Sequence, residues 1–365
     1  MSISSNRLLS LDILRGLTVA GMILVNNGAG HEHFYPLTHS AWNGLTPCDL
    51  VFPFFLFMVG VSIPMSSKSS MGRILWRSVK MFAIGVLLHA WDMWIWGSDE
   101  ILANLRIWGV LERIALCYLA VATLHHYCKS LPSWRSLIPV FCLTLLVVYT
   151  GILLLGNGYA QDETNIAGII DRWLVGENHL YHKSPIDPEG LLGTLSAIAH
   201  TLIGLHCGLI VKDKVLLQER LIRLFCMASG LILCGWFLSF GLPLNKRIWS
   251  PSYVLVTCGF ATALLSLLIC YEKRREQEMP DKSSLFNLPF SFFHSFGLNP
   301  IALYVLSEML APISGILNLG GMMHESLTAM GLSPQLASLC YALSFVAFMS
   351  LIAQFLYRRR IYIRL

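Results

Sequence analysis

The chain has 365 residues, of which 55% are hydrophobic and only 13% are charged. Soluble domains usually carry about a quarter charged residues, so this composition excludes an ordinary soluble enzyme and indicates a membrane protein. The formal net charge of +5 is explained by basic loops between apolar segments, so we expect no nucleic-acid partner.

Long apolar segments predict the fold. A hydrocarbon core of roughly 30 Å needs about 20 apolar residues per helix, and about ten segments meet this length. We therefore predict an all-α, polytopic transmembrane bundle that forms one domain over residues 1–365. Most of the 26 Lys and Arg residues lie on one side, which places both termini in the cytoplasm. The predicted spans lie near residues 11–29, 49–67, 72–92, 107–127, 136–156, 190–211, 221–242, 251–271, 298–314 and 335–357.

Two features concern processing and metals. Nothing before Leu9 resembles a cleavable signal peptide, so we expect the first helix to remain in the protein. The chain has ten cysteines, and all but Cys48 fall within predicted spans. Because CxxC and HExxH spacings are absent, we expect neither a disulfide framework nor a protein-held metal.

The first predicted span carries polar groups at both ends. Asp12 and Arg15 are three positions apart and therefore share a helical face. The simpler interpretation is an N-cap at Ser10 with an acid and a snorkelling arginine behind it, while the alternative is that Arg15 holds a ligand phosphate. Asn26, near the other end, is a candidate to fix a carbonyl or hydroxyl group, with a plain helix C-cap as the alternative.

The segment before the second predicted span is the most informative. His39 and Asp49 lie ten residues apart at the predicted outer mouth, with Trp42 and Asn43 between them. Histidine can accept a proton near neutral pH, and a carboxylate can orient its ring. Asp49 also completes the capping-box pattern that begins at Thr46, so capping alone is a sufficient explanation for this carboxylate.

Other charged and aromatic residues are candidates for ligand contacts. Arg73 and Arg77 are spaced to meet phosphates, although the positive-inside rule also explains them. Glu308 lies within a predicted span, where a charged group is a functional candidate by default. For Arg106 and Arg113, at the outer start of the fourth predicted span, a structural ion pair is the alternative. The segment 157–189 is expected to fold as a periplasmic cap. The remaining candidates for substrate contacts are Arg106, Arg113, Asp187, Glu189, Trp249 and Glu308.

Taken together, these motifs resemble the heparan-alpha-glucosaminide N-acetyltransferase family over nearly the whole chain. The resemblance is carried by collinear segments at residues 7–16, 25–26, 39–46, 49–53, 106–113, 187–193, 245–254 and 299–304. It implies a bacterial inner-membrane enzyme that moves an acetyl group from cytoplasmic acetyl-CoA to an amino sugar in the periplasm. It also implies that His39, in its Trp-Asn-Gly context, is the active-site histidine. The outer loops differ from those of lysosomal members, which leaves the acceptor open.

The residue types suit this chemistry. An amine that attacks a thioester must lose a proton, and an imidazole can accept it; Asn26, Asn43 or backbone N–H groups are candidates to stabilise the oxyanion. We expect direct transfer, with an acetyl-histidine intermediate as the alternative. An ion-coupled transporter and an O-acyltransferase of an envelope polysaccharide are competing functions. Membrane lipid is an expected partner. The sequence leaves open whether the protein forms a homodimer.

Overall fold

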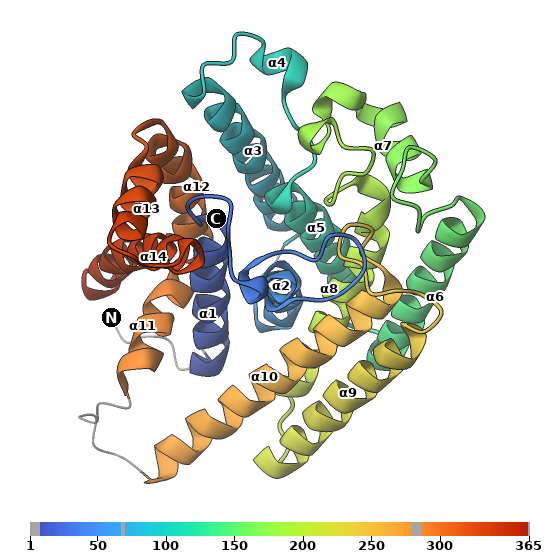
Figure 1. Cartoon of the computed structure of the whole chain (residues 1–365). Coiled ribbons are helices and arrows are strands. Elements are labelled where there is room, and N and C mark those ends of the chain that lie inside the picture. The colour runs from blue at the N-terminus through green and yellow to red at the C-terminus, as the bar shows by residue number, and fades with distance from the viewer. Residues whose placement is uncertain (1–7, 67–69, 279–286, 364–365) are drawn as a thin grey trace. The chain divides into compact units, whose positions relative to one another are not determined.

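The computed structural model describes residues 8–66, 70–278 and 287–363. Its regular structure in these ranges is helical, without a β-strand, so the predicted all-α fold is confirmed (Figure 1). The chain divides into two compact units. Unit 1 comprises Met1–His39, Thr46–Val51 and Ala263–Leu365, and unit 2 comprises Ser40–Leu45 and Phe52–Thr262. The single domain that we expected over residues 1–365 stays a prediction.

Unit 1 is built around the first helix, which packs against α11, α12 and α14. Two short 3₁₀ turns precede the second apolar segment. The elements of unit 1 are α1 (Leu9–Asn26), η1 (Tyr35–Leu37), η2 (Pro47–Leu50), the second part of α10 (Pro251–Glu278), α11 (Asn287–Leu298), α12 (Pro300–Ile316), α13 (Leu319–Ala329) and α14 (Pro334–Arg358).

Unit 2 contains the intervening helices, of which α8 is the most central because it contacts α5, α6, α7 and α9. Helices α3 and α5 run side by side (Figure 1). The elements of unit 2 are α2 (Val51–Ser62), η3 (Ile63–Met65), α3 (Met71–Ile95), α4 (Ile101–Asn104), α5 (Val110–Cys128), α6 (Trp134–Leu155), α7 (Ile166–Val175), η4 (Glu177–His179), η5 (Tyr181–Lys183), α8 (Leu191–Val211), α9 (Leu217–Leu238) and the start of α10.

The described helices support a polytopic membrane protein. Eight of them are long and apolar enough to cross a membrane, and α11 with α12 makes a ninth if this pair, bent by 86°, is one span. Pro300 suits the start of the second helix of this pair, since proline fits the first turn of a helix, and it occupies that position in α12. The predicted span near residues 107–127 forms α5 but is not among the nine. The orientation of the termini stays a prediction.

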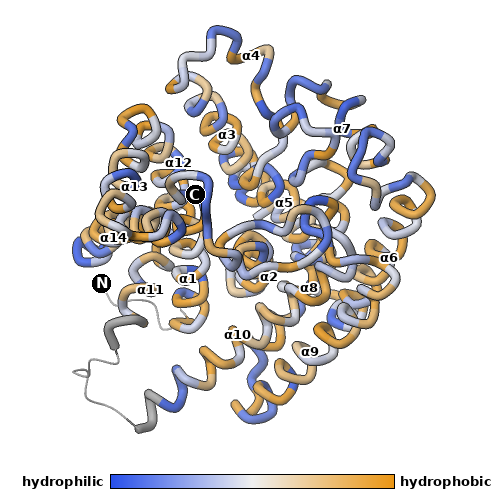
Figure 2. The backbone as a smooth tube through the Cα atoms, viewed as in Figure 1, coloured by the Kyte–Doolittle hydropathy of each residue, from blue (hydrophilic) through white to orange (hydrophobic). Residues whose placement is uncertain are grey.

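Apolar surface is left uncovered on several of these helices. Figure 2 shows mainly hydrophobic residues along α6 and α9. Only 28% of the apolar window of α6 and 17% of that of α9 are buried, and large side chains such as Leu143 and Phe237 are exposed. Such continuous apolar faces are what lipid covers in a membrane protein.

The segment 157–189 is folded, because it contains α7, η4 and η5. Helix α7 packs against α6 and α8, and the Asn165 side chain caps it by accepting a hydrogen bond from the N–H of Ala167 at 2.9 Å. Arg172 donates to the carbonyl oxygens of Pro185 and Glu163. These bonds make the segment an integral part of unit 2, while its role as a periplasmic cap stays a prediction.

Glycines allow the closest helix contacts. A Cβ at Gly16 of α1 would lie 1.6 Å from a carbonyl oxygen of α11, and a Cβ at Gly297 of α11 would lie 1.7 Å from the carbonyl oxygen of Asp12. The same reciprocal arrangement joins α2 and α8 of unit 2 at Gly60 and Gly204. Small residues let helix backbones approach closely, which gives dispersion contacts where no hydrophobic effect drives helix association.

Replacing Gly16 with alanine tests this contact. The added methyl group forces α1 and α11 apart, so we expect Gly16→Ala to destabilise the protein by about 1–3 kcal/mol. The measurement is the melting temperature of the detergent-purified protein. Gly230→Ala in α9 is the matched control, because its Cβ would meet nothing within 4 Å and alanine favours the helix. Equal melting temperatures for Gly16→Ala and the wild type would contradict the role of Gly16.

Candidate active site

In unit 1, the histidine predicted to be catalytic pairs with the predicted carboxylate. His39 Nδ1 lies 2.7 Å from Asp49 Oδ1, and this contact assigns the Nδ1 proton to the hydrogen bond, which leaves Nε2 as an acceptor. The Asp49 side chain is fully buried, whereas 52% of the His39 side chain is exposed. The imidazole is therefore held through Nδ1, while about half of the side chain is exposed.

Asp49 also caps the following helical turn. Its Oδ2 accepts hydrogen bonds from the N–H of Thr46 at 3.1 Å and from the Thr46 hydroxyl at 3.0 Å. The Thr46 hydroxyl also contacts the carbonyl oxygen of Thr38 at 2.7 Å, next to the histidine. The capping box predicted from the sequence is confirmed, and the same carboxylate serves the cap and the imidazole together.

A thiol beside the imidazole had no predicted role. Cys48 Sγ lies 3.2 Å from Nδ1 and 3.7 Å from Nε2 of His39, and Cys48 is buried. The sequence places Cys48 one residue before Asp49, inside the capping turn, so its proximity to the ring follows from the same turn that positions the carboxylate.

The other predicted groups of unit 1 form two separate pairs. Arg15 donates to Asp12 at 2.9 Å, which is the predicted pairing on one helical face. The Asn26 amide donates to Glu308 at 3.1 Å, so two predicted site residues from α1 and α12 meet. The predicted N-cap at Ser10 is wrong, because α1 begins earlier and its N-cap is Leu8. The backbone N–H of Ser10 instead donates to a carboxylate of α10.

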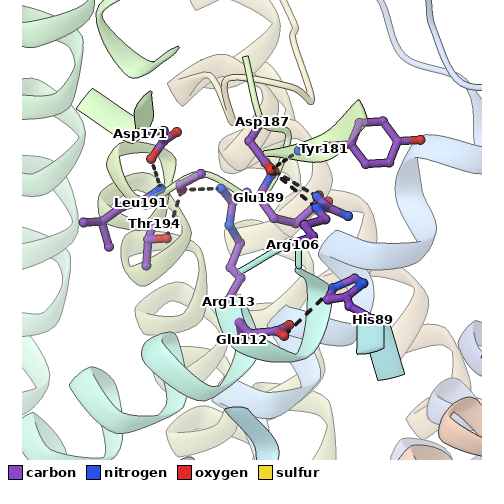
Figure 3. Close-up of polar contacts among 11 residues, drawn as sticks. His89, Arg106, Glu112, Arg113, Asp171, Tyr181, Asp187, Glu189, Leu191 and Thr194 are labelled. Carbon is purple, nitrogen blue, oxygen red and sulfur yellow. Dashed lines mark hydrogen bonds and ion pairs between the residues drawn. The ribbon is translucent and has the colours of Figure 1, made fainter. Parts of the chain in front are cut away.

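In unit 2, three predicted substrate contacts form one buried ion network (Figure 3). Arg106 Nη2 lies 2.8 Å from Asp187 Oδ1 and 2.6 Å from Glu189 Oε2, and its guanidinium lies 4.5 Å from the centre of the Tyr181 ring. Burial opposes the charge on both Arg106 and Glu189. The mutual attraction wins, since the pKa of Arg106 is raised above its usual range by Glu189 and Asp187, and that of Glu189 is lowered by Arg106, Arg113 and Lys246.

Asp187 has no hydrogen-bonding capacity to spare. Its Oδ1 accepts from Arg106 Nη2 and from the N–H of Glu189, and its Oδ2 accepts from the N–H of Tyr181 and, at 3.4 Å, from Arg106 Nε. A carboxylate offers about four lone-pair sites. In this conformation Asp187 is therefore occupied by Arg106 and by backbone N–H groups that precede α8, and it has no acceptor position left for the predicted substrate contact.

Arg113 also contacts other residues of unit 2. Its Nη2 donates to the carbonyl oxygen of Gly190 at 2.8 Å, and its guanidinium lies 5.0 Å from the centre of the Trp249 ring. Both side chains are buried, with Trp249 fully so. In this conformation Trp249, predicted as a substrate contact, packs as part of the core and presents no exposed surface to a substrate.

The Trp-Asn-Gly motif is held by two loops of unit 2. Trp42 Nε1 donates to the carbonyl oxygen of Tyr159 at 3.1 Å, and Asn43 Oδ1 accepts from Asn245 Nδ2 at 3.1 Å. The backbone N–H of Gly44 donates to a carbonyl oxygen at 2.8 Å in the same loop as Asn245. These bonds connect two of the motifs recognised in the sequence, at residues 39–46 and 245–254, and join the first of them to the segment 157–189.

The two predicted phosphate contacts of unit 2 lie on α3. Arg73 is exposed and its Nε contacts Ser70 Oγ at 3.3 Å, while the Arg77 guanidinium lies 4.9 Å from the centre of the Tyr118 ring. They are one helical turn apart, as predicted from their spacing. Among the described residues, no group of three or more His, Cys, Asp or Glu side chains is placed to hold a metal ion.

Known proteins are similar to this chain in sequence. A family model described as heparan-alpha-glucosaminide N-acetyltransferase, catalytic, matches residues 7–165. The chain is 32% identical to the heparan-alpha-glucosaminide N-acetyltransferase of Mus musculus over 379 residues, which is 84% of this chain and 54% of the relative. It is 32% identical to that of Homo sapiens over 332 residues, 72% of this chain and 48% of the relative. The chain thus spans about half the length of these relatives.

A buried carboxyl group in α7 makes stability depend on pH. Asp171 Oδ1 accepts the N–H of Leu191 at 2.8 Å, and its Oδ2 makes no hydrogen bond to a described residue. Burial raises the pKa of Asp171 from 3.8 to about 6. The folded protein therefore holds a proton that the unfolded chain has lost between these values. The resulting stabilisation is complete below pH 3.8 and is lost as the pH rises through 6.

The variant Asp171→Asn tests this dependence, because the amide keeps an oxygen acceptor for Leu191 and stays neutral. Between pH 5 and pH 7.5 the wild type should lose stability relative to the variant by about 1–1.5 kcal/mol, which is roughly half of what the full shift in pKa would give. The measurement is the melting temperature at both pH values. Asp162→Asn is the control, since Asp162 is exposed and hydrogen bonds from Thr164 lower its pKa. A constant difference between wild type and Asp171→Asn across this range would contradict the assignment.

Proposed function

Because the chain belongs to the heparan-alpha-glucosaminide N-acetyltransferase family, we propose that it transfers an acetyl group from acetyl-CoA to the amine of a glucosamine-type sugar. His39 acts as the general base, and Asp49 orients it. The proposal extends to a bacterial inner membrane, with acetyl-CoA entering from the cytoplasm and the sugar from the periplasm. The activity comes from the relatives, and the residue roles come from the geometry described above.

The observation that carries the residue assignment is the 2.7 Å contact between His39 and Asp49. A buried carboxylate that accepts a hydrogen bond from the Nδ1–H group fixes the tautomer in which Nε2 can accept a proton. It also stabilises the imidazolium that forms when the base is protonated. The His39 side chain is 52% exposed, whereas that of Asp49 is fully buried.

The proposed reaction is direct transfer. The neutral amine attacks the thioester carbonyl carbon, and His39 Nε2 accepts a proton from the amine as the C–N bond forms. The tetrahedral intermediate then collapses, the C–S bond breaks, and the imidazolium returns the proton to the CoA thiolate. The products are the acetamido sugar and CoA, and no charged acetyl-imidazole is needed.

The donor needs cationic partners for its phosphates. Arg73 is the best placed of the proposed contacts, because it is exposed and lies one turn from Arg77 on α3. Arg15 is the weaker candidate, since it already pairs with Asp12. The amide nitrogen of Asn43 can donate to acetyl-CoA or to the oxyanion, because the hydrogen bond with Asn245 uses the amide oxygen of Asn43.

The variant His39→Ala tests the general base. We expect the protein to fold and the rate of transfer to fall by about 10² to 10⁴, measured as release of free CoA from acetyl-CoA in the presence of glucosamine. His33→Ala is the matched control, because His33 is a second histidine of unit 1 whose Nδ1 contacts Ser338 at 2.8 Å. Turnover by His39→Ala at the wild-type rate would refute the role of this residue.

The two roles of Asp49 can be separated. Asp49→Asn should lower the rate of transfer less than His39→Ala does, and should also destabilise the protein by about 1 kcal/mol, because the amide cannot serve both Thr46 donors and the imidazole. Thr46→Val removes only the hydroxyl contacts of the cap, so it should lose stability while keeping the pH profile of transfer. The measurements that separate the two roles are the rate of transfer and the melting temperature of each variant. An identical loss of activity in the two variants would show that the carboxylate acts only through the cap.

A further inference from the structure

Three arginines of unit 2 converge on one acidic residue. Arg135, in the first turn of α6, has its Nη1 2.6 Å from Asp213 Oδ1, and Arg223, in the second turn of α9, has its Nη1 3.6 Å from Asp213 Oδ2. Arg220 Nη2 donates to the backbone carbonyl oxygen of Asp213 at 2.6 Å. Side chains from two helices therefore meet at the loop between α8 and α9.

The positive charge at this end of unit 2 exceeds the negative charge. The segments 125–135 and 206–223 together contain six Lys and Arg residues but only two acids. Both acids already pair with arginines. Lys129 and Lys214 are exposed and lie outside these ion pairs. An anion is the partner that such an excess of positive charge attracts.

The ends of four helices carry these charges and lie together. The Trp134 indole N–H of α6 donates to His125 Nδ1 of α5 at 3.0 Å, and Trp134 directly precedes Arg135. Lys129, after α5, and Lys212, after α8, both act electrostatically on His125. The charges thus form one surface, which we call the basic cluster and define as Lys129, Arg135, Lys212, Lys214, Arg220 and Arg223.

Two helices begin at the basic cluster. Helix α6 starts at Trp134 and α9 starts at Leu217, and the side chains of their N-cap residues, Ser133 and Leu216, make no capping hydrogen bond. The first turn of a helix presents unpaired backbone N–H groups and the positive end of the helix dipole. Both helix starts therefore strengthen the positive field of the basic cluster, and phosphate groups suit such a field.

Apolar surface continues directly from the basic cluster. Leu216 and Ile222, which lie beside its residues in the chain, are 77% and 62% exposed. The apolar faces of α6 and α9 that leave the cluster are largely uncovered (Figure 2). The 22 residues of α6 extend about 33 Å at 1.5 Å per residue, which matches a hydrocarbon core of roughly 30 Å. The cluster therefore lies at the level of lipid headgroups.

We propose that the basic cluster binds the phosphate of an anionic phospholipid headgroup, while the acyl chains lie along α6 and α9. The planar forks of Arg135 and Arg223 fit phosphate oxygens. The positive-inside rule explains why basic residues lie on one side, but it does not require that they converge from several helices. The sequence predicts that this side faces the cytoplasm, where the leaflet carries anionic lipids. This lipid site is separate from acetyl transfer.

A lipid titration tests the inference. The full chain, purified in a neutral detergent, is titrated with phosphatidylglycerol or with phosphatidylcholine of the same acyl chains, and its melting temperature is measured. Phosphatidylglycerol should raise the melting temperature more than phosphatidylcholine does, and the difference should shrink at high salt. In Lys214→Gln, which breaks no ion pair, and in Arg135→Gln, half of the maximal rise should need about fivefold more phosphatidylglycerol.

Controls separate this site from general charge effects. Lys183→Gln removes an exposed positive charge from the segment 157–189, at the far end of α6, and should keep the wild-type response. Inorganic phosphate at matched ionic strength should not reproduce the rise. If Arg135→Gln fails to fold, Lys214→Gln decides the question.

Three results would overturn the inference. The first is an equal rise of the melting temperature with both lipids. The second is a wild-type response to phosphatidylglycerol in every cluster variant that folds. The third is a full response to inorganic phosphate alone, which would assign the basic cluster to a soluble anion.

Discussion

Pairing of charges inside an apolar environment is the constraint on which this structure depends. An ionised group in a protein interior is tolerated only with a counter-charge or hydrogen bonds, and lipid around the helices makes the requirement stricter. The buried network of Arg106, Asp187 and Glu189 meets it with short contacts. Because Asp187 also accepts backbone N–H groups of Tyr181 and Glu189, this ion network positions the chain that leads into α8.

The same constraint explains why single residues serve two purposes. Asp49 accepts hydrogen bonds from the capping threonine through one oxygen and contacts His39 through the other. A cap holds the carboxylate at one place on the helix start, so the imidazole meets a partner that does not move. Capping and catalysis had been competing interpretations of Asp49 in the sequence, and the structure makes the cap the means by which the histidine is oriented.

Local patterns in the sequence predicted much of the fold. The apolar runs, the capping box at Thr46 and the pairing of Asp12 with Arg15 all depend on residues within a few positions of each other. Contacts between distant residues were not predictable. Asn26 and Glu308 are 282 positions apart, and Arg106 and Asp187 are 81 apart, so which candidates meet depends on how the helices pack. The wrong N-cap at Ser10 has a similar origin, since its N–H bonds to a carboxylate of α10.

Helix α5 shows why a helix of the bundle can lack the hydropathy expected of a span. Helix α5 is absent from the nine candidate spans, and it begins with Glu112 and Arg113, both buried. Buried polar residues lower the hydropathy of a helix without exposing it, because the helices around it supply the apolar surface. Charges at such a position cost stability, and Gly85 and Gly109, where a Cβ would lie within 2.6 Å of the Glu112 carboxyl group, give up further packing. The cost of burying Glu112 is reduced by Arg106, which acts on this carboxyl group electrostatically.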